Sequence, residues 1–146
     1  MKDLVLEDVY VYLMERTIRQ LKRRFQVLLK ELDPDLNITS DQWVILKRIS
    51  EREAITQRDL ANITFKDPAS VTRTIDLMEK KGWMKRESVD GDRRAYQLTL
   101  TQAGWSLVKL ITPLAQQVRE EGLSGISGKE FTGLKNTLNQ IYENVR

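Results

Sequence analysis

Residues 88–101 of the chain read SVDGDRRAYQLTLT. An Asp-Gly pair between two short runs of alternating apolar residues is a strong signal for a β-hairpin. It predicts strands over residues 83–89 and 94–98, joined by an acidic turn. Arg93 and Arg94 come directly after the acidic residues, at the tip of the predicted hairpin. A hairpin tip needs no arginines in order to fold, so this pair indicates a partner outside the hairpin.

Helical patterns surround the hairpin on both sides. Apolar spacing and capping signals predict three helices over about 4–32, 57–63 and 68–81, and three more that begin after Thr39, Thr101 and Ser127. We expect Pro113 to kink or break the fifth helix. A compact pair of helices followed at once by a hairpin is the helix-turn-helix plus wing arrangement. The outer helices carry more apolar surface than a winged helix could cover, so we expect a second copy of the chain to cover it.

The composition excludes several classes of protein. The chain has 146 residues and a net charge of +3, and it contains neither cysteine nor histidine. It therefore has no disulfide framework, no thiolate metal site and no histidine base. No paired carboxylates stand out, so we expect neither an enzyme nor a bound metal or cofactor. The first residues lack the apolar stretch of a signal peptide and no segment could span a membrane, so we expect a soluble, cytoplasmic protein.

The predicted helix over residues 68–81 has an unusual outward face. Asp67 and Pro68 supply a cap followed by a proline at the first helical position, and Gly82 ends the helix. The outward positions carry small residues, hydroxyls and one arginine. Such a face can enter the major groove, where arginine binds O6 and N7 of guanine. The candidate DNA-binding residues of this segment are Lys66, Ser70, Thr72, Arg73 and Thr74. The alternative is an exposed helix that happens to be rich in Ser and Thr.

The two arginines of the hairpin also have two interpretations. They are either solvated charges paired with Asp90 or Asp92, or DNA ligands. As DNA ligands, one would enter the minor groove and the other would bind phosphate, with an aspartate holding the side chain in one rotamer. Residues 56–101 carry nine Lys and Arg against seven Asp and Glu, a balance of +2. Any affinity for DNA must therefore come from the placement of the charges.

Two motifs in the middle of the chain match one known family. The stretch from Asp92 to Thr101, followed by Gly104, fits the pattern DxRxxxxxLT. Residues 67–82, DPASVTRTIDLMEKKG, lie upstream at the matching separation. These features resemble the signature and the recognition helix of the MarR family of winged-helix transcription regulators, and the order of elements matches over nearly the whole chain.

The resemblance implies one MarR-like domain over residues 1–146 that forms a homodimer. Helices within about 1–36 and 102–146 would interlock at the dimer interface, and about 37–101 would form the DNA-binding lobe. It places Ser70, Thr72 and Arg73 on the base-facing surface. It also makes Arg94 the wing arginine, with Asp92 as its acidic partner.

Many members of this family bind small aromatic or phenolic ligands in a crevice between the dimer helices and the DNA-binding lobe, and so release DNA. Tyr12, Arg16 and Trp43 are candidates to line such a crevice here, although an apolar structural role is the stronger interpretation. We expect Trp43, Trp83 and Trp105 to lie in the core.

We therefore expect a mainly α fold with a small β-hairpin wing, a winged helix-turn-helix flanked by N- and C-terminal dimerisation helices. The expected function is sequence-specific binding of double-stranded DNA by a homodimer on a pseudo-palindromic operator. Such a regulator would act as a repressor that a small ligand releases. The alternative is a winged-helix module that binds proteins and has no specific DNA binding. The arginine pair and the hydroxyl-lined helix favour DNA.

Overall fold

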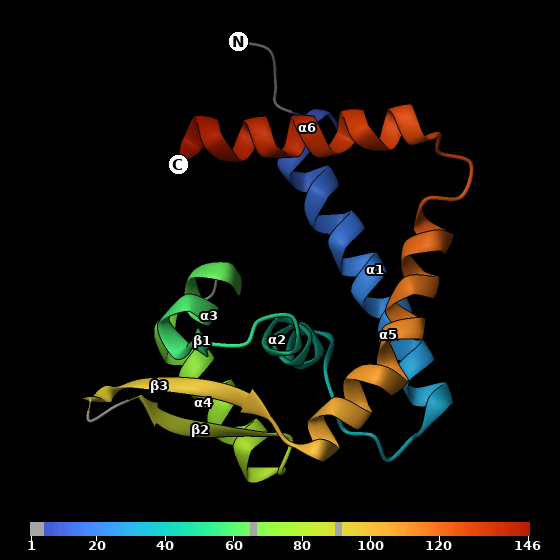
Figure 1. Cartoon of the computed structure of the whole chain (residues 1–146). Helices are drawn as coiled ribbons and strands as arrows, with labels where there is room; N and C mark the ends of the chain where they lie inside the picture. The colour runs from blue at the N-terminus through green and yellow to red at the C-terminus, as the bar shows by residue number, and fades with distance from the viewer. Residues whose placement is uncertain (1–4, 65–66, 90–91) are drawn as a thin grey trace.

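Helices make up most of the chain, and three short strands form one small antiparallel sheet (Figure 1). The computed structural model describes residues 5–64, 67–89 and 92–146. The expected mainly helical fold with a hairpin wing is confirmed. No helix among these residues combines the length and the apolar character that crossing a bilayer requires.

The first long helix, α1, spans Tyr10–Leu32 and starts later than the predicted start near residue 4. A 3-10 turn, Leu6–Asp8, precedes it, and the extended backbone of Val9 separates the two. The buried side chains of α1 all lie in its C-terminal half, at Phe25, Leu28 and Leu29. The N-terminal half of α1 therefore projects beyond the core of the chain.

Three shorter helices form a compact group: α2 (Ser40–Ser50), α3 (Gln57–Thr64) and α4 (Pro68–Lys80). The predicted capping box of α2 is present, because the Thr39 hydroxyl accepts the N–H of Gln42 and the Gln42 side chain accepts the N–H of Thr39. Gly82 follows α4 with φ of 78°, a conformation that favours glycine, and so ends this helix as predicted.

The sheet has the strand order β1–β3–β2, with β1 at Ile55–Thr56, β2 at Met84–Val89 and β3 at Asp92–Leu100. The predicted hairpin is confirmed as β2 and β3. The sequence did not predict β1, because two residues are too few to show an alternating pattern. Buried Ile55 pairs with buried Leu98, so β1 attaches the hairpin to the start of α3.

The helix α5, Gln102–Gly122, begins at the predicted cap Thr101 and continues through Pro113 without interruption. The prediction that the helix breaks at this proline is therefore wrong. Pro113 is exposed, while Ile111 and Val118 on either side of it are buried. Packing before and after the proline holds the helix together despite the lost backbone hydrogen bond.

The last helix, α6, spans Gly128–Val145 and begins at the predicted capping box of Ser127 and Glu130. All residues of α6 are described, and none of them is buried. Its exposed apolar side chains are Leu134, Leu138, Tyr142 and Val145. In Figure 1 this helix lies on the opposite side of the molecule from the sheet. Among the described residues of one chain, the apolar face of α6 has no core to pack against.

The hydrophobic core lies where α2, α3, α4, α5, the sheet and the C-terminal half of α1 meet. Among its fully buried side chains are Leu29, Ile45, Leu46, Leu60, Ile75, Met78, Leu98 and Ile111. Trp43 and Trp83 pack partly against it. Trp105 is 52% exposed, so its expected core position is wrong. Trp105 is not on the buried face of α5, which includes Gly104 and Val108.

Candidate nucleic-acid interface

The first turn of α4 is held by the carboxylate of Asp67. This carboxylate accepts the N–H of Ser70 at 2.9 Å and the hydroxyl of Ser70 at 2.5 Å. The bond from the hydroxyl is the main cause, and the bond from the N–H the second, of a pKa of Asp67 below its ordinary value. A negative charge here also interacts favourably with the helix dipole. The predicted cap at Asp67 is confirmed.

The hydroxyl groups near the start of α4 have their protons committed inside the chain. Ser70 donates to Asp67. Thr72 donates to the carbonyl oxygen of Pro68 at 2.9 Å, and Thr74 donates to that of Ser70 at 3.0 Å. A hydroxyl has one proton and two acceptor lone pairs. While these bonds persist, all three groups can accept a hydrogen bond from a ligand but cannot donate one.

Arg73 supplies N–H donors on this part of α4. Its side chain is exposed, and its Nη2 donates to the Ser70 hydroxyl oxygen at 3.1 Å. A guanidinium carries five N–H donors. Within the described residues Ser70 is its hydrogen-bond partner, so most of these donors face solvent. The chain of Asp67, Ser70 and Arg73 thus orients one arginine at the start of the helix.

The hairpin places the two predicted arginines in strand β3. The strand begins at Asp92, which pairs with Val89. Arg93 and Arg94 are therefore its second and third residues, and the strand starts two residues earlier than the predicted start at residue 94. The side chains of Asp92, Arg93 and Arg94 lie outside the described part of the structure, as does the whole of Lys66.

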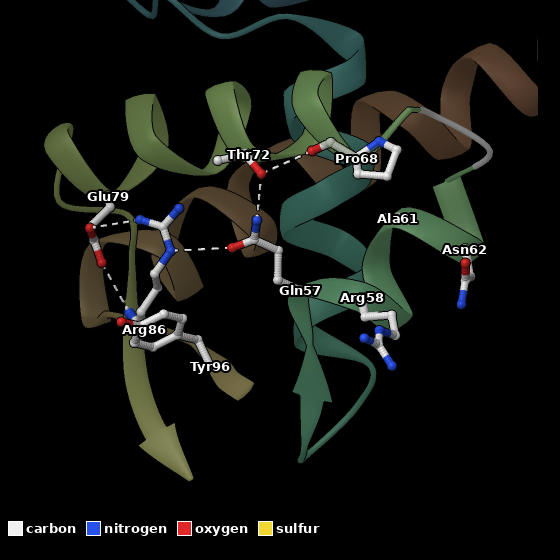
Figure 2. A pocket seen from close by; sticks show the side chains of 9 residues that line it. All are labelled: Gln57, Arg58, Ala61, Asn62, Pro68, Thr72, Glu79, Arg86 and Tyr96. Atoms are coloured by element: carbon white, nitrogen blue, oxygen red, sulfur yellow. Dashed lines mark hydrogen bonds and ion pairs between the residues drawn. The ribbon is translucent and has the colours of Figure 1, made fainter. Parts of the chain in front are cut away.

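A polar network that the sequence did not reveal joins β2 to α4 and α3 (Figure 2). Arg86 on β2 donates to the carboxylate of Asp76 at 2.5 Å and to that of Glu79 at 3.1 Å, both on α4. Its Nε donates to Gln57 Oε1 at 3.4 Å. The amide nitrogen of Gln57 in turn donates to the Thr72 hydroxyl oxygen at 2.6 Å. The network therefore ends on a candidate DNA-binding residue.

Strand alternation contains a signal for this network. Met84 and Arg86 lie two residues apart on β2 and so face the same side of the sheet. Met84 is buried, which marks that side as the inner one. A charged group at an inner position is costly unless it has partners. Arginine at this place in the strand therefore predicts carboxylates on the helix beneath it.

A hollow of about 1000 Å³ lies between α3, α4 and the sheet (Figure 2). Arg58 and Asn62 line it from α3, Thr72 from α4, and Arg86 and Tyr96 from the strands. Its lining is rich in polar groups that can bind hydrogen-bonding partners. The residues of α4 that line the hollow run from Pro68 at its start to Glu79 near its end.

The three residues suggested for an effector site are not brought together within one chain. Tyr12 and Arg16 line a surface of α1, where the Arg16 guanidinium carbon lies 6.0 Å from the centroid of the Tyr12 ring. Trp43 lines a separate apolar crevice of about 190 Å³ between α1, α2 and α5. It packs edge-on against Phe25, with 5.4 Å between ring centroids. Its indole N–H is buried and has no hydrogen-bond partner among the described residues.

The part of the chain that the structure describes contains no cluster of three or more carboxylates that could hold a metal ion. The acidic side chains around α4 instead pair with arginine or cap the helix. The chemistry of this surface is therefore hydrogen bonding and ion pairing.

Known proteins match both the sequence and the fold. The model of the MarR family matches residues 38–96. The HTH-type transcriptional regulator SarZ of Staphylococcus haemolyticus is 27% identical over 143 residues, which cover 98% of this chain and 93% of that protein. The middle part of the chain, residues 38–96, is similar to the MarR family. The MarR family and this relative are transcriptional regulators and not enzymes.

Solved structures share this MarR-family fold over nearly the whole chain. A mutant MarR from E. coli in complex with operator DNA has a TM-score of 0.75 at 27% identity, covering 96% of this chain and 99% of that one. BpsR from Bordetella bronchiseptica, whose DNA binding is regulated by 6-hydroxynicotinic acid, has a TM-score of 0.81 at 22% identity. The match to BpsR covers 97% of this chain and 99% of that one.

Proposed function

We propose that this chain is a MarR-like transcription regulator, a homodimer that binds a pseudo-palindromic DNA operator and represses transcription by occupying a promoter. The observation that carries the proposal is the exposed start of α4, where Ser70 orients Arg73 next to a hairpin with two arginines. The E. coli MarR with the same fold, at 27% identity, was solved on operator DNA.

The chemistry of α4 supports a division of labour in the major groove. Arg73 supplies donors for guanine O6 and N7. The hydroxyl protons of this surface are already donated within the chain, at Ser70, Thr72 and Thr74. These side chains therefore suit the amino groups of adenine and cytosine, which need acceptors, or the methyl group of thymine. Arg94 enters the flanking minor groove with Asp92 as its partner. Lys66 and Arg93 bind phosphate.

The apolar faces left open in one chain support a homodimer. Exposed apolar side chains of the outer helices lie at Tyr10, Val11, Ile18, Leu110, Leu134, Leu138 and Tyr142. Large apolar side chains that stay exposed in one chain are typical of an interface. Helices within about 1–36 and 102–146 pair with those of a second copy, and residues 37–101 form the DNA-binding lobe. Two-fold symmetry then places half-sites about 34–36 Å apart.

A small aromatic or phenolic effector would act through the crevice at Trp43. The crevice is lined almost entirely by apolar groups, which suit the ring of such a ligand. At about 190 Å³ it is smaller than most ligand sites, so a second chain must add to it. We infer that Tyr12 and Arg16 of α1 supply this added part of the effector site. The effector shifts the dimer only by its differential affinity for the two shapes.

Selection from a random duplex library with the purified protein tests the proposal. A palindromic winner whose affinity falls steeply with salt is the expected result. Weak binding without enrichment would favour a winged-helix module that binds protein instead. The same selection with Arg73→Ala should relax the preference at one position per half-site. Arg48→Ala, an exposed arginine of α2 paired with Glu51, should leave the motif unchanged.

The proposed groove of the wing arginine has its own test. Arg94→Ala should weaken binding most on operators with A·T-rich flanks, because a narrow minor groove attracts arginine. Affinities are measured on a set of operators that differ only in their flanks. An equal loss on every flank would make Arg94 a phosphate ligand.

A further inference from the structure

Arg86 is a partly buried cation at the seam between the wing and the recognition helix. Its side chain is only 17% exposed. All three guanidinium nitrogens donate, to Asp76 and Glu79 on α4 and to Gln57 on α3. The backbone N–H of Arg86 donates to Glu79 as well, at 3.1 Å. One residue of the strand thus contacts both helices of the helix-turn-helix.

The charges of this cluster make Arg86 a poor ligand for phosphate. One guanidinium faces two carboxylates, so the cluster as a whole carries one negative charge. Moving Arg86 onto a phosphate would leave Asp76 and Glu79 unpaired next to each other and next to the DNA backbone. A cation that already neutralises two acids is more useful for fixing geometry than for binding a polyanion.

Gln57 transmits this geometry to α4. Its Oε1 accepts from Arg86, which turns its amide nitrogen toward α4. That nitrogen donates to the Thr72 hydroxyl, whose own proton goes to Pro68. An amide can occupy two flipped orientations, and its partners decide between them. With Arg86 in place, Gln57 must present a donor to Thr72, and Thr72 is held in one rotamer.

We propose that Arg86 is a positioning residue for base selection: through Gln57 it holds the side chain of Thr72 in the rotamer that reads the DNA. This inference rests on the proposed DNA binding of α4. It assigns specificity to a residue of β2 that lies one layer behind the reading face. Loss of Arg86 frees the amide of Gln57 to flip and the hydroxyl of Thr72 to rotate. Different bases are then accepted opposite Thr72.

The test compares the base preferences of full-length variants. Library selection is run with the wild type, Arg86→Ala, Gln57→Ala and Thr72→Val. The control is Lys85→Ala, the neighbouring residue of β2, which is exposed and pairs with Glu87 rather than with α4. Each variant is checked for cooperative thermal unfolding at the assay temperature. Gln57→Ala keeps every charge of the cluster, so it reports on the relay even if Arg86→Ala folds poorly.

We expect Arg86→Ala and Gln57→Ala to lower the preference at one and the same position of each half-site, about fivefold. Thr72→Val should change the preference at that position too. The double variant Arg86→Ala/Gln57→Ala should lose no more preference at that position than Arg86→Ala alone, because both residues act through one relay. Lys85→Ala should keep the wild-type motif.

Two results would overturn the inference. If Arg86→Ala keeps the motif but flattens the dependence of affinity on salt by about one phosphate contact, Arg86 is a phosphate ligand. If Arg86→Ala and Gln57→Ala alter different positions, no relay exists between them. A wild-type protein that enriches no motif would instead refute the proposed DNA binding, and this inference with it.

Discussion

Replacing Gly104 by alanine tests how α5 is joined to the wing. A Cβ at this position would lie 1.9 Å from the carbonyl oxygen of Trp83, far inside van der Waals contact. That oxygen accepts the N–H of Thr101 at 3.1 Å, so it cannot retreat without losing a hydrogen bond. The hydroxyl of Thr101 is also tied, since it donates to Gly82. The clash therefore falls on backbone held from two sides.

The sign of the effect distinguishes packing from helix propensity. Alanine in place of glycine should stabilise a helix by up to about 1 kcal/mol. Overpacking costs about 1–3 kcal/mol, and a lost hydrogen bond about 1 kcal/mol more. We expect Gly104→Ala to lower the free energy of unfolding by about 1–3 kcal/mol. Urea denaturation followed by circular dichroism, at one protomer concentration, measures the difference.

Gly133 in α6 provides the matched control. A Cβ there would meet nothing within 4 Å in the described part of the chain, and Gly133 does not lie among the apolar positions of the helix. Gly133→Ala should therefore leave stability unchanged or raise it by up to about 1 kcal/mol. A Gly104→Ala protein as stable as the wild type would show that α5 does not approach Trp83 as described.

Substitutions at three further positions test the cap, the α1–α5 contact and the dimer. Asp67→Ala should cost about 1 kcal/mol of stability, and Asp67→Asn less because the amide oxygen still caps α4; equal losses in thermal unfolding would contradict the capping role. Arg24 and Gln117 lower the pKa of Glu121 to about 2 from the ordinary 4.5. A carboxylate with a lowered pKa stabilises the fold above pH 4.5, and this contribution is lost as the pH falls toward 2. The difference in stability between the wild type and Glu121→Gln should therefore shrink over that range, and a difference that is independent of pH would rule out the ion pair. Leu134→Glu, on the exposed face of α6, should convert a dimer into monomers in sedimentation, and an unchanged dimer would place the interface elsewhere.

Local signals in the sequence were enough for the starts of the helices after α1, for the hairpin and for the family resemblance. The caps at Thr39, Asp67, Thr101 and Ser127 are all confirmed. A cap depends on a side chain and an N–H three residues away, so it forms from neighbours along the chain. The hairpin of β2 and β3 likewise pairs segments that lie close together along the chain. Such signals act independently of the rest of the chain.

Contacts between distant segments decided the rest. The strand β1 exists because Ile55 meets Leu98, and α5 stays intact at Pro113 because the core holds both of its halves. The sequence identified Gly104 only as part of a motif, whereas the approach of Trp83 supplies its physical reason. None of these contacts lies within reach of a pattern read along one segment.

The candidate site divides in the same way. The sequence by itself determined that hydroxyls and an arginine stand at the start of α4, next to a hairpin that carries two more arginines. The hydroxyl protons are used by neighbours three or four residues away in the chain. Only the tertiary structure decided that Gln57 donates to Thr72 and that Arg86 serves α4 instead of solvent. A residue type sets which bonds a group can make, but packing decides which partners come within 3 Å of it. Recognition depends on the bonds that remain.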